Sequence, residues 1–222
     1  MRRILITVCI LFLFFSCSDD DSDNQEPQND NFYALTVGNS WEYRYYRYDI
    51  QNDNFQITEA VQYVSIVSSE DIDGAIYFKY RYFTTGNDNN STSIPANGES
   101  FKYLREDSGN LVDQNNHLLF IREDNEERLV NYIDFGGGHS ISEYRRLLEN
   151  SFSITTEAGI FETIAVELFS RDEEGNQFGG NQSEGNAKHF YANGIGAVLN
   201  ETTFAGNPQH FLERRLQSYN VQ

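Results

Sequence analysis

Acidic side chains are the most numerous groups in this chain that could do chemistry, and they gather in short runs. Glycoside hydrolysis needs two carboxyl groups held about 5–9.5 Å apart across a cleft. Each run stands among Gly and Asn residues, which are typical of exposed loops. The sequence therefore favours solvated loops, and no residue is assigned a catalytic role. A hydrolase that uses loop carboxylates on a glycan or another polymer stays as the alternative. The runs are Asp71/Asp73, Asp124/Glu126/Glu127 and Asp172/Glu173/Glu174.

Histidines and acidic loops are also the places where metal ions bind. The four histidines are His117, His139, His189 and His210, and no two have the short spacing that places two ligands on one strand face. Residues 171–186 carry carboxylates and amides of the kind that bind calcium. The sequence predicts no metal ligand and no cofactor, and calcium at this loop is left open.

Two further ligand classes can be judged from local composition. Gly136-Gly137-Gly138 lacks the Lys-Ser/Thr that follows a phosphate-binding loop, so it is interpreted as a turn. The aromatic side chains of Tyr46, Tyr48, Tyr77 and Tyr82 could stack on sugar rings if they point outward. Tyrosine-rich strands more often pack in half-buried sheets. A glycan or a protein is kept as a candidate partner.

The start of the chain carries the one cysteine with a predicted chemical role. Residues 1–16 hold Arg2 and Arg3, then an apolar run too short to span a membrane, which needs about 20 residues. This order is that of a secretory signal. The segment resembles a bacterial lipoprotein signal, in which the cysteine is acylated and the chain is cut before it, although Phe14 stands where leucine is usual. The resemblance implies lipidation of Cys17.

The residues after Cys17 form a short acidic segment. Ser18-Asp19-Asp20-Asp21-Ser22-Asp23 resembles the run that directs lipoproteins of Bacteroidota to the outer face of the outer membrane. Like-charged polar residues stay solvated, so residues 17–31 are predicted to be a flexible tether. The resemblance implies a surface-exposed outer-membrane lipoprotein, held to the membrane by its acyl chains.

The net charge limits the classes of partner that the protein can bind. The chain carries −18, which becomes −20 once Arg2 and Arg3 leave with the signal. Such a domain is repelled by nucleic acid and by anionic lipid, so the acyl chains must provide the membrane affinity. Cys9 also leaves with the signal, and the mature fold is predicted to contain no disulfide. Its stability must come from the packing of residues 32–222.

Residues 32–222 are predicted to form one mainly β domain. Short apolar runs recur every 8–12 residues, which predicts an antiparallel β-sandwich or open-barrel-like domain of roughly ten short strands. Residues 140–150 are the only plausible helix, because Tyr144, Leu147 and Leu148 have i, i+3, i+4 spacing, although a strand fits equally well.

Individual strands can be placed more closely. Alternation in residues 55–67 predicts a half-buried strand whose apolar face carries Phe55, Ile57, Val61, Tyr63 and Val67. It joins residues 76–82 in a hairpin across a turn at residues 71–74. Trp41 begins a strand whose parity shifts near Tyr45, as a β-bulge would cause. In the last strand the predicted shared face carries His210, Leu212, Arg214 and Leu216.

Three stretches together resemble a group of secreted bacterial lipoproteins of uncharacterised function: Leu35 to Tyr43, Gly159 to Thr163, and Tyr191 to Val198. The resemblance implies a single all-β envelope domain and brings no catalytic set. Trp41 reads as a core anchor, and Gly194 and Gly196 suit a turn with positive φ. The first hypothesis is a non-enzymatic cell-surface lipoprotein, acting as a binding or envelope-structural module.

Overall fold

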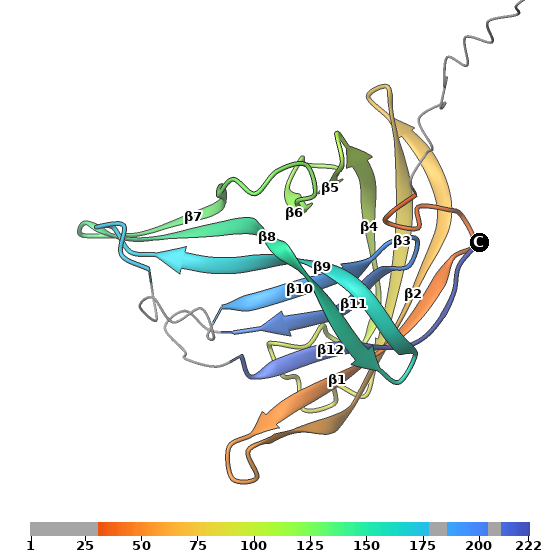
Figure 1. Cartoon of the computed structure of the whole chain (residues 1–222), viewed down its shortest axis with the longest axis horizontal. Coiled ribbons are helices and arrows are strands. Elements are labelled where there is room, and N and C mark those ends of the chain that lie inside the picture. Colours follow the sequence, from red (N-terminus) through yellow and green to blue (C-terminus); the bar gives the residue numbers. More distant parts are fainter. Residues whose placement is uncertain (1–30, 178–185, 204–209) are drawn as a thin grey trace, which may run out of the picture.

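Twelve antiparallel strands make up a single curved sheet in the computed structural model, which describes residues 31–177, 186–203 and 210–222. No helix occurs in those ranges, as Figure 1 makes visible. The order across the sheet is β6-β5-β4-β3-β2-β1-β12-β11-β10-β9-β8-β7. Nearly all sequential strands are therefore neighbours, and the C-terminal strand β12 lies beside β1 and joins the two halves. The fold is an open-barrel-like β domain, as predicted.

The strand bounds are β1 Ser40–Asp49, β2 Asn54–Ile72, β3 Ala75–Thr85, β4 Gly98–Asp107, β5 Asn110–Asp113, β6 Leu118–Phe120, β7 Arg128–Gly136, β8 His139–Thr156, β9 Gly159–Arg171, β10 Ala187–Ala192, β11 Gly196–Thr202 and β12 Leu212–Asn220. The count of roughly ten was too low. The description of the strands as short was also wrong, because β2 has 19 residues and β8 has 18. Within the described residues, no helix is long and apolar enough to cross a membrane.

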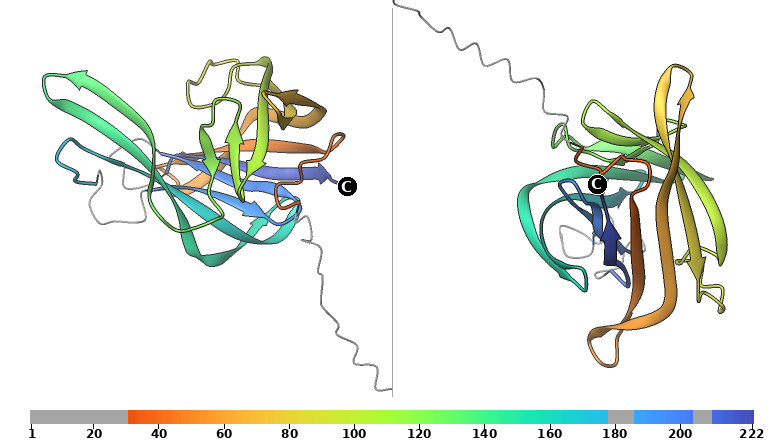
Figure 2. Two further views of the ribbon diagram at one scale, coloured as in Figure 1. Left: turned by 90° about the horizontal axis from the view of Figure 1, so that it is seen from above. Right: turned by 90° about the vertical axis from the view of Figure 1, so that its right-hand side faces the viewer.

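The two edge strands of the sheet, β6 and β7, do not pair with each other and leave an open seam in the sheet, which Figure 2 shows from two further sides. Arg145 of β8 reaches across this seam, where its Nη1 donates a hydrogen bond to the carbonyl oxygen of Leu118 in β6. Beside the seam, Phe120 and Ile121 are almost fully buried. A side-chain contact from β8, rather than a strand ladder, thus links β6 to the other end of the sheet.

The segment before β1 closes one end of the sheet. Phe32, Tyr33 and Ala34 are buried, and this segment lies at the same end as the C-terminus (Figure 1). The Phe32 carbonyl accepts from Gly194 N at 3.1 Å, and the Asn39 amide donates to the Ala34 carbonyl at 2.9 Å. Phe32 is therefore part of the packed domain. Cys17 and all but the last residue of the predicted tether lie outside the described residues.

Residues 140–150 form strand rather than helix. Strand β8 pairs with β7 on one side and β9 on the other, so its backbone groups are satisfied by neighbours. The i, i+3, i+4 spacing of Tyr144, Leu147 and Leu148 arises instead because side chains cover both faces of the sheet at β8. Leu147 packs against the main core, whereas Leu148 packs against a second cluster of Ala165, Phe190 and Leu199 on the opposite face. A register shift between Leu147 and Ser151 adds to the irregular pattern.

The hairpin of β2 and β3 is confirmed, with Ile72 opposite Ala75 across the predicted turn. The predicted apolar face of β2 was wrong at Ile57, Tyr63 and Val67, which are exposed (Ile57 by 55%), and right at Val61, which is buried. Ala60, Val64 and Ile66 are buried as well. Apolar residues occupy both faces of this strand, so alternation alone could not identify the buried one. The predicted β1 bulge is confirmed by the register shift between Arg44 and Tyr46.

Gly196 shows why the sequence pattern around Ile195 needs glycine. Its φ is +89°, and a Cβ there would lie 3.4 Å from the Tyr33 carbonyl oxygen. We expect Gly196→Ala to lower the free energy of unfolding by about 1–2 kcal/mol through left-handed strain. A Cβ at 3.4 Å would be in ordinary van der Waals contact, so Gly74→Ala, at φ +84° with open space around it, should lose about as much. Urea unfolding measures both losses, and a much larger loss for Gly196→Ala would contradict this account of the site.

Candidate functional site

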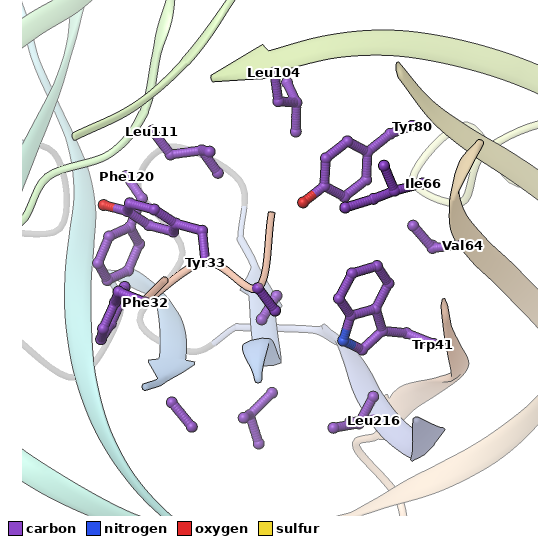
Figure 3. Packing of buried hydrophobic residues seen from close by; sticks show 14 of the residues in the cluster. Phe32, Tyr33, Trp41, Val64, Ile66, Tyr80, Leu104, Leu111, Phe120 and Leu216 are labelled. Carbon is purple, nitrogen blue, oxygen red and sulfur yellow. The ribbon is translucent and has the colours of Figure 1, made fainter. Parts of the chain in front are cut away.

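The interior of the curved sheet contains a cavity lined by aromatic residues and one arginine. About 50 Å³ of it is open to the centre of a water molecule, which is room for several waters or a small chemical group. Five tyrosines line it together with Trp41 and Arg214, and apolar residues complete the wall. Figure 3 shows Tyr33, Trp41 and Tyr80 pointing into the space that the strands enclose. The tyrosines are Tyr33, Tyr43, Tyr80, Tyr82 and Tyr191.

Strand alternation places these side chains on one face. Trp41 and Tyr43 are two residues apart on β1, and Tyr80 and Tyr82 are two residues apart on β3. Residues at this spacing point to the same side of a sheet. The rings of Trp41 and Tyr80 stack with centroids 6.0 Å apart, and the Trp41 indole N–H donates to the Ile195 carbonyl at 2.7 Å. A ring stack and a hydrogen bond thus position the Trp41 side chain in this wall.

The hydroxyls of the five cavity tyrosines differ in whether they have a hydrogen-bond partner. Those of Tyr33 and Tyr43 donate to the carbonyls of Gly109 and Ala197 at 2.7 and 2.9 Å. The hydroxyls of Tyr80, Tyr82 and Tyr191 have no hydrogen-bond partner among the residues that the structure describes. Burial raises the pKa of all three, so they remain neutral donors and acceptors. These groups are available to a molecule in the cavity.

Arg214 is the charged group of the cavity. Its Nη1 donates to Gln62 Oε1 at 2.8 Å, and its guanidinium lies 4.2 Å from the centre of the Tyr43 ring. Burial acts to lower the pKa of Arg214, but the pKa stays above its usual value, and arginine remains charged at neutral pH. No carboxylate in the described part of the chain lies within 4.0 Å of it, although acids outnumber bases 34 to 16. By contrast, Arg105 and Arg128 pair with Asp107 and Asp124.

A second arginine, Arg145 at the seam, completes the positive interior. Its Nε is buried without a hydrogen-bond partner among the described residues. Burial lowers the pKa of Arg145, but arginine stays charged at neutral pH. Burial, Arg145 and Arg214 together lower the pKa of His189 to about 3, so this imidazole is neutral. The same two arginines act to lower the pKa of Tyr191, although burial raises it overall. Both arginines therefore act electrostatically on His189 and Tyr191.

This arrangement suits recognition of an anion. A guanidinium without a carboxylate partner presents several N–H donors to a carboxylate, sulfate or phosphate group. Hydroxyls of Tyr80, Tyr82 and Tyr191 can donate to the same group or to neighbouring hydroxyls. The aromatic walls exclude bulk water and strengthen each such contact. The cavity thus combines positive charge, free polar groups and a fixed shape.

The carboxylates considered as catalytic groups instead stabilise turns. One oxygen of Asp71 accepts from Gly74 N at 2.8 Å, one of Asp124 accepts from Glu126 N at 2.9 Å, and one of Asp172 accepts from Asn176 N at 2.7 Å. The Asn176 side chain also lowers the pKa of Asp172. The prediction that these runs form loops is confirmed for residues 124–127 and 172–174, whereas Asp71 lies in strand β2 beside the turn. Residues 178–185 of the acidic loop lie outside them.

Two acids of these runs form ion pairs at the surface. Glu127 lies 2.8 Å from Arg171, and Glu173 lies 2.9 Å from the exposed His139. His139 follows the predicted glycine turn, where Gly136, Gly137 and Gly138 all have positive φ. Neither acid lines the cavity.

The predicted sugar-stacking tyrosines do not form an exposed platform. Tyr46 and Tyr77 are buried, at 7% and 5% exposure. The Tyr46 hydroxyl binds the Glu157 carboxylate, and Tyr77 packs under the guanidinium of Arg105. Tyr82 lines the cavity. The prediction that Tyr46, Tyr77 and Tyr82 could stack on sugars from outside was wrong. The alternation of these strands directs the three side chains inward or beneath long polar side chains.

Sequence reasoning did not assign a role to Arg214 or Arg145. The signal for Arg214 was present, since it shares a strand face with Leu212 and Leu216, both of which are buried. A charged residue between two core leucines indicates a cavity or a buried partner. For Arg145 no such signal existed, because its position depends on the meeting of β6 and β8, which are separated in sequence and in the sheet.

Comparison with known proteins gives the fold and not a family. No family model and no curated protein matches the sequence. A crystal structure from Bacteroides fragilis NCTC 9343, of a protein predicted to be exported and with a YmcC-like fold, is 12% identical with a TM-score of 0.50. The match covers 85% of this chain and 98% of that one. A predicted lipoprotein of Parabacteroides distasonis ATCC 8503 is 16% identical over the same shares, with a TM-score of 0.42. The chain therefore has a fold similar to the YmcC-like fold of that exported protein.

Proposed function

We propose that this chain is a non-enzymatic lipoprotein of the bacterial cell surface whose β domain binds a small anionic ligand inside the curved sheet. Arg214 carries the proposal, because it keeps its charge in the cavity with no carboxylate within 4.0 Å among the described residues. Leaving a buried charge without a counter-ion is costly, and a ligand anion would supply one. The net charge of −18 makes the missing partner more notable, since acids are abundant elsewhere.

The size of the cavity restricts the ligand. About 50 Å³ for water centres suits a single carboxylate or sulfate group, or the acidic end of a larger glycan, rather than a whole oligosaccharide. The three unpartnered tyrosine hydroxyls match a group that also carries hydroxyls, as a uronic acid does. We therefore place uronic acids and similar sugar acids first among the candidate ligands.

The anchoring part of the proposal rests on the sequence. Residues 1–16 act as the signal, Cys17 carries the acyl chains, residues 17–31 form the tether and residues 32–222 form the binding domain. The fold similarity to a protein of Bacteroides fragilis that is predicted to be exported supports a location in the cell envelope. Placement on the outer surface of the outer membrane is inferred from the acidic run after Cys17.

A non-enzymatic role is supported by the use of the loop acids. The carboxylates of Asp71, Asp124 and Asp172 hold turns, and those of Glu127 and Glu173 are ion-paired. A glycosidase would need two carboxyls facing one cleft, with pKa values set apart for acid and base. The cavity lining contains no carboxylate among the described residues. Binding without turnover is thus the function that this cavity supports best.

A glycan array tests the ligand class. The chain from residue 18 to 222, made without its signal, should bind glycans that end in a uronic acid or a sulfated sugar. It should ignore the neutral glycans of the same backbone, because Arg214 discriminates by charge. Binding only to neutral glycans, or release of a shortened glycan during incubation, would contradict the proposal.

A further inference from the structure

A second group of polar side chains lies on the opposite face of the sheet from the cavity. Arg214 and Leu216 point inward, so alternation directs Glu213 outward. Glu201 of β11 stands directly opposite Glu213 of β12 in the strand register, and His210 precedes β12. Both carboxylates are buried, with Glu201 9% and Glu213 7% exposed. This cluster plays no part in the proposed anion site.

Three ligand atoms converge in this cluster. His210 Nε2 lies 2.8 Å from Glu213 Oε1 and 3.9 Å from Glu201 Oε1, and single ligand atoms of all three residues lie within 4.8 Å of one another. Tetrahedral zinc with ligands at 2.0–2.2 Å holds its ligand atoms about 3.4 Å apart. The spacings here bracket that value, so small side-chain rotations would bring all three atoms to one ion.

Groups outside the cluster hold the ligands in place. The second oxygen of Glu201 accepts from the backbone N–H of Lys188 at 2.9 Å, and the second oxygen of Glu213 accepts from Arg215 Nε at 2.6 Å. The His210 ring stacks on Phe55, with ring centres 4.9 Å apart and an interplanar angle of 16°. Outer contacts of this kind orient metal ligands and leave their remaining lone pairs free.

The electrostatics of the cluster also favour a cation. Glu201 and Glu213 are both buried, and their carboxylates approach the same nitrogen, His210 Nε2. A divalent ion would offset the repulsion between the two carboxylates.

We propose that Glu201, His210 and Glu213 bind one divalent transition-metal ion, with zinc as the best fit. One imidazole and two carboxylates are zinc ligands, and a water would complete the tetrahedral set. Calcium is disfavoured, because it requires six to eight oxygen ligands and the cluster offers a nitrogen and few oxygens. The ion would join β11 to the start of β12 on the face opposite the cavity.

Isothermal titration of the chelator-treated chain, residues 18–222, with zinc chloride tests this site. We expect one ion per chain, and calcium chloride should give no comparable heat. His210→Ala should weaken zinc binding by at least about 100-fold, because it removes the only nitrogen ligand. The matched control is His139→Ala, which removes a histidine from an exposed pair with Glu173. Equal weakening in the two variants, or no zinc binding by the wild type, would overturn the proposal.

A measurement on the wild type keeps the test decisive if a variant fails to fold. Crystals grown with zinc should show an anomalous scattering peak between the side chains of Glu201, His210 and Glu213. A peak elsewhere with none at this cluster would overturn the assignment. Anion binding in the cavity should be retained when zinc is removed, so failure of one proposal leaves the other open to its own test.

Discussion

Replacement of Cys17 by serine should move the protein from the membrane fraction to the soluble fraction. Each buried methylene of an acyl chain contributes about 0.8 kcal/mol, and two or more chains give stable anchoring. The remaining chain carries a strong negative charge and has no other predicted means of membrane attachment. Centrifugation of cell lysates and immunoblotting of both fractions measure the change, and metabolic labelling with a fatty acid should lose its signal.

The matched control for this prediction is Cys9→Ser. Cys9 lies within the predicted signal and is removed with it, so this variant should stay labelled and sediment with membranes. A Cys17→Ser protein that still sediments would contradict acylation as the means of anchoring. Loss of labelling in both variants would show that the processing signal itself had been damaged, and the predicted roles of the two cysteines would then be wrong.

Trp41→Ala should lower the free energy of unfolding by about 3–5 kcal/mol, the usual range for a buried large aromatic residue. Trp41 is 5% exposed, stacks on Tyr80 and donates to the Ile195 carbonyl. Its removal enlarges the cavity and leaves that carbonyl without its indole partner. Urea unfolding followed by far-ultraviolet circular dichroism measures the loss without relying on tryptophan fluorescence.

Tyr132→Ala provides the comparison for a surface aromatic. Tyr132 is 58% exposed on β7, so its truncation should change stability by less than about 1 kcal/mol. Trp41→Phe should fall between the two, because it keeps an aromatic ring and loses the hydrogen bond to Ile195. If Trp41→Ala costs no more than Tyr132→Ala, Trp41 is not the core anchor that the packing indicates.

The strand content could be predicted because local signals were strong. The turn at residues 71–74 and the alternation around it sufficed for the β2–β3 hairpin. Faces were harder to assign, since β2 carries Ile57 and Tyr63 on the exposed side and Val64 and Ile66 on the buried side. Strand β8 shows the same difficulty, because Leu147 and Leu148 pack into different clusters. Hydrophobic alternation identifies a face only when the other face is polar.

The candidate sites depend on contacts between distant segments. Arg214 reaches Gln62, 152 positions away in sequence, and Glu201 meets Glu213 only through the β11–β12 register. No local spacing encodes either contact. The sequence did indicate the positive φ at Gly196 and the anchor at Trp41, because glycine tolerates this backbone conformation and a large aromatic side chain favours burial. The chemistry of a barrel interior follows from strand order, which short patterns do not specify.

The most direct test of the anion site is a titration that follows Trp41 fluorescence. Trp41 is the only tryptophan of the chain and lines the cavity, so a bound ligand should change its emission. Glucuronate should produce a saturable change and glucose none. Arg214→Met should weaken glucuronate binding by about 10- to 100-fold, the loss of one hydrogen-bonded charge contact. Arg81→Met, which removes an exposed arginine, should bind as the wild type does. Equal responses to glucuronate and glucose, or unchanged binding by Arg214→Met with its fold intact, would contradict an anion site in the barrel.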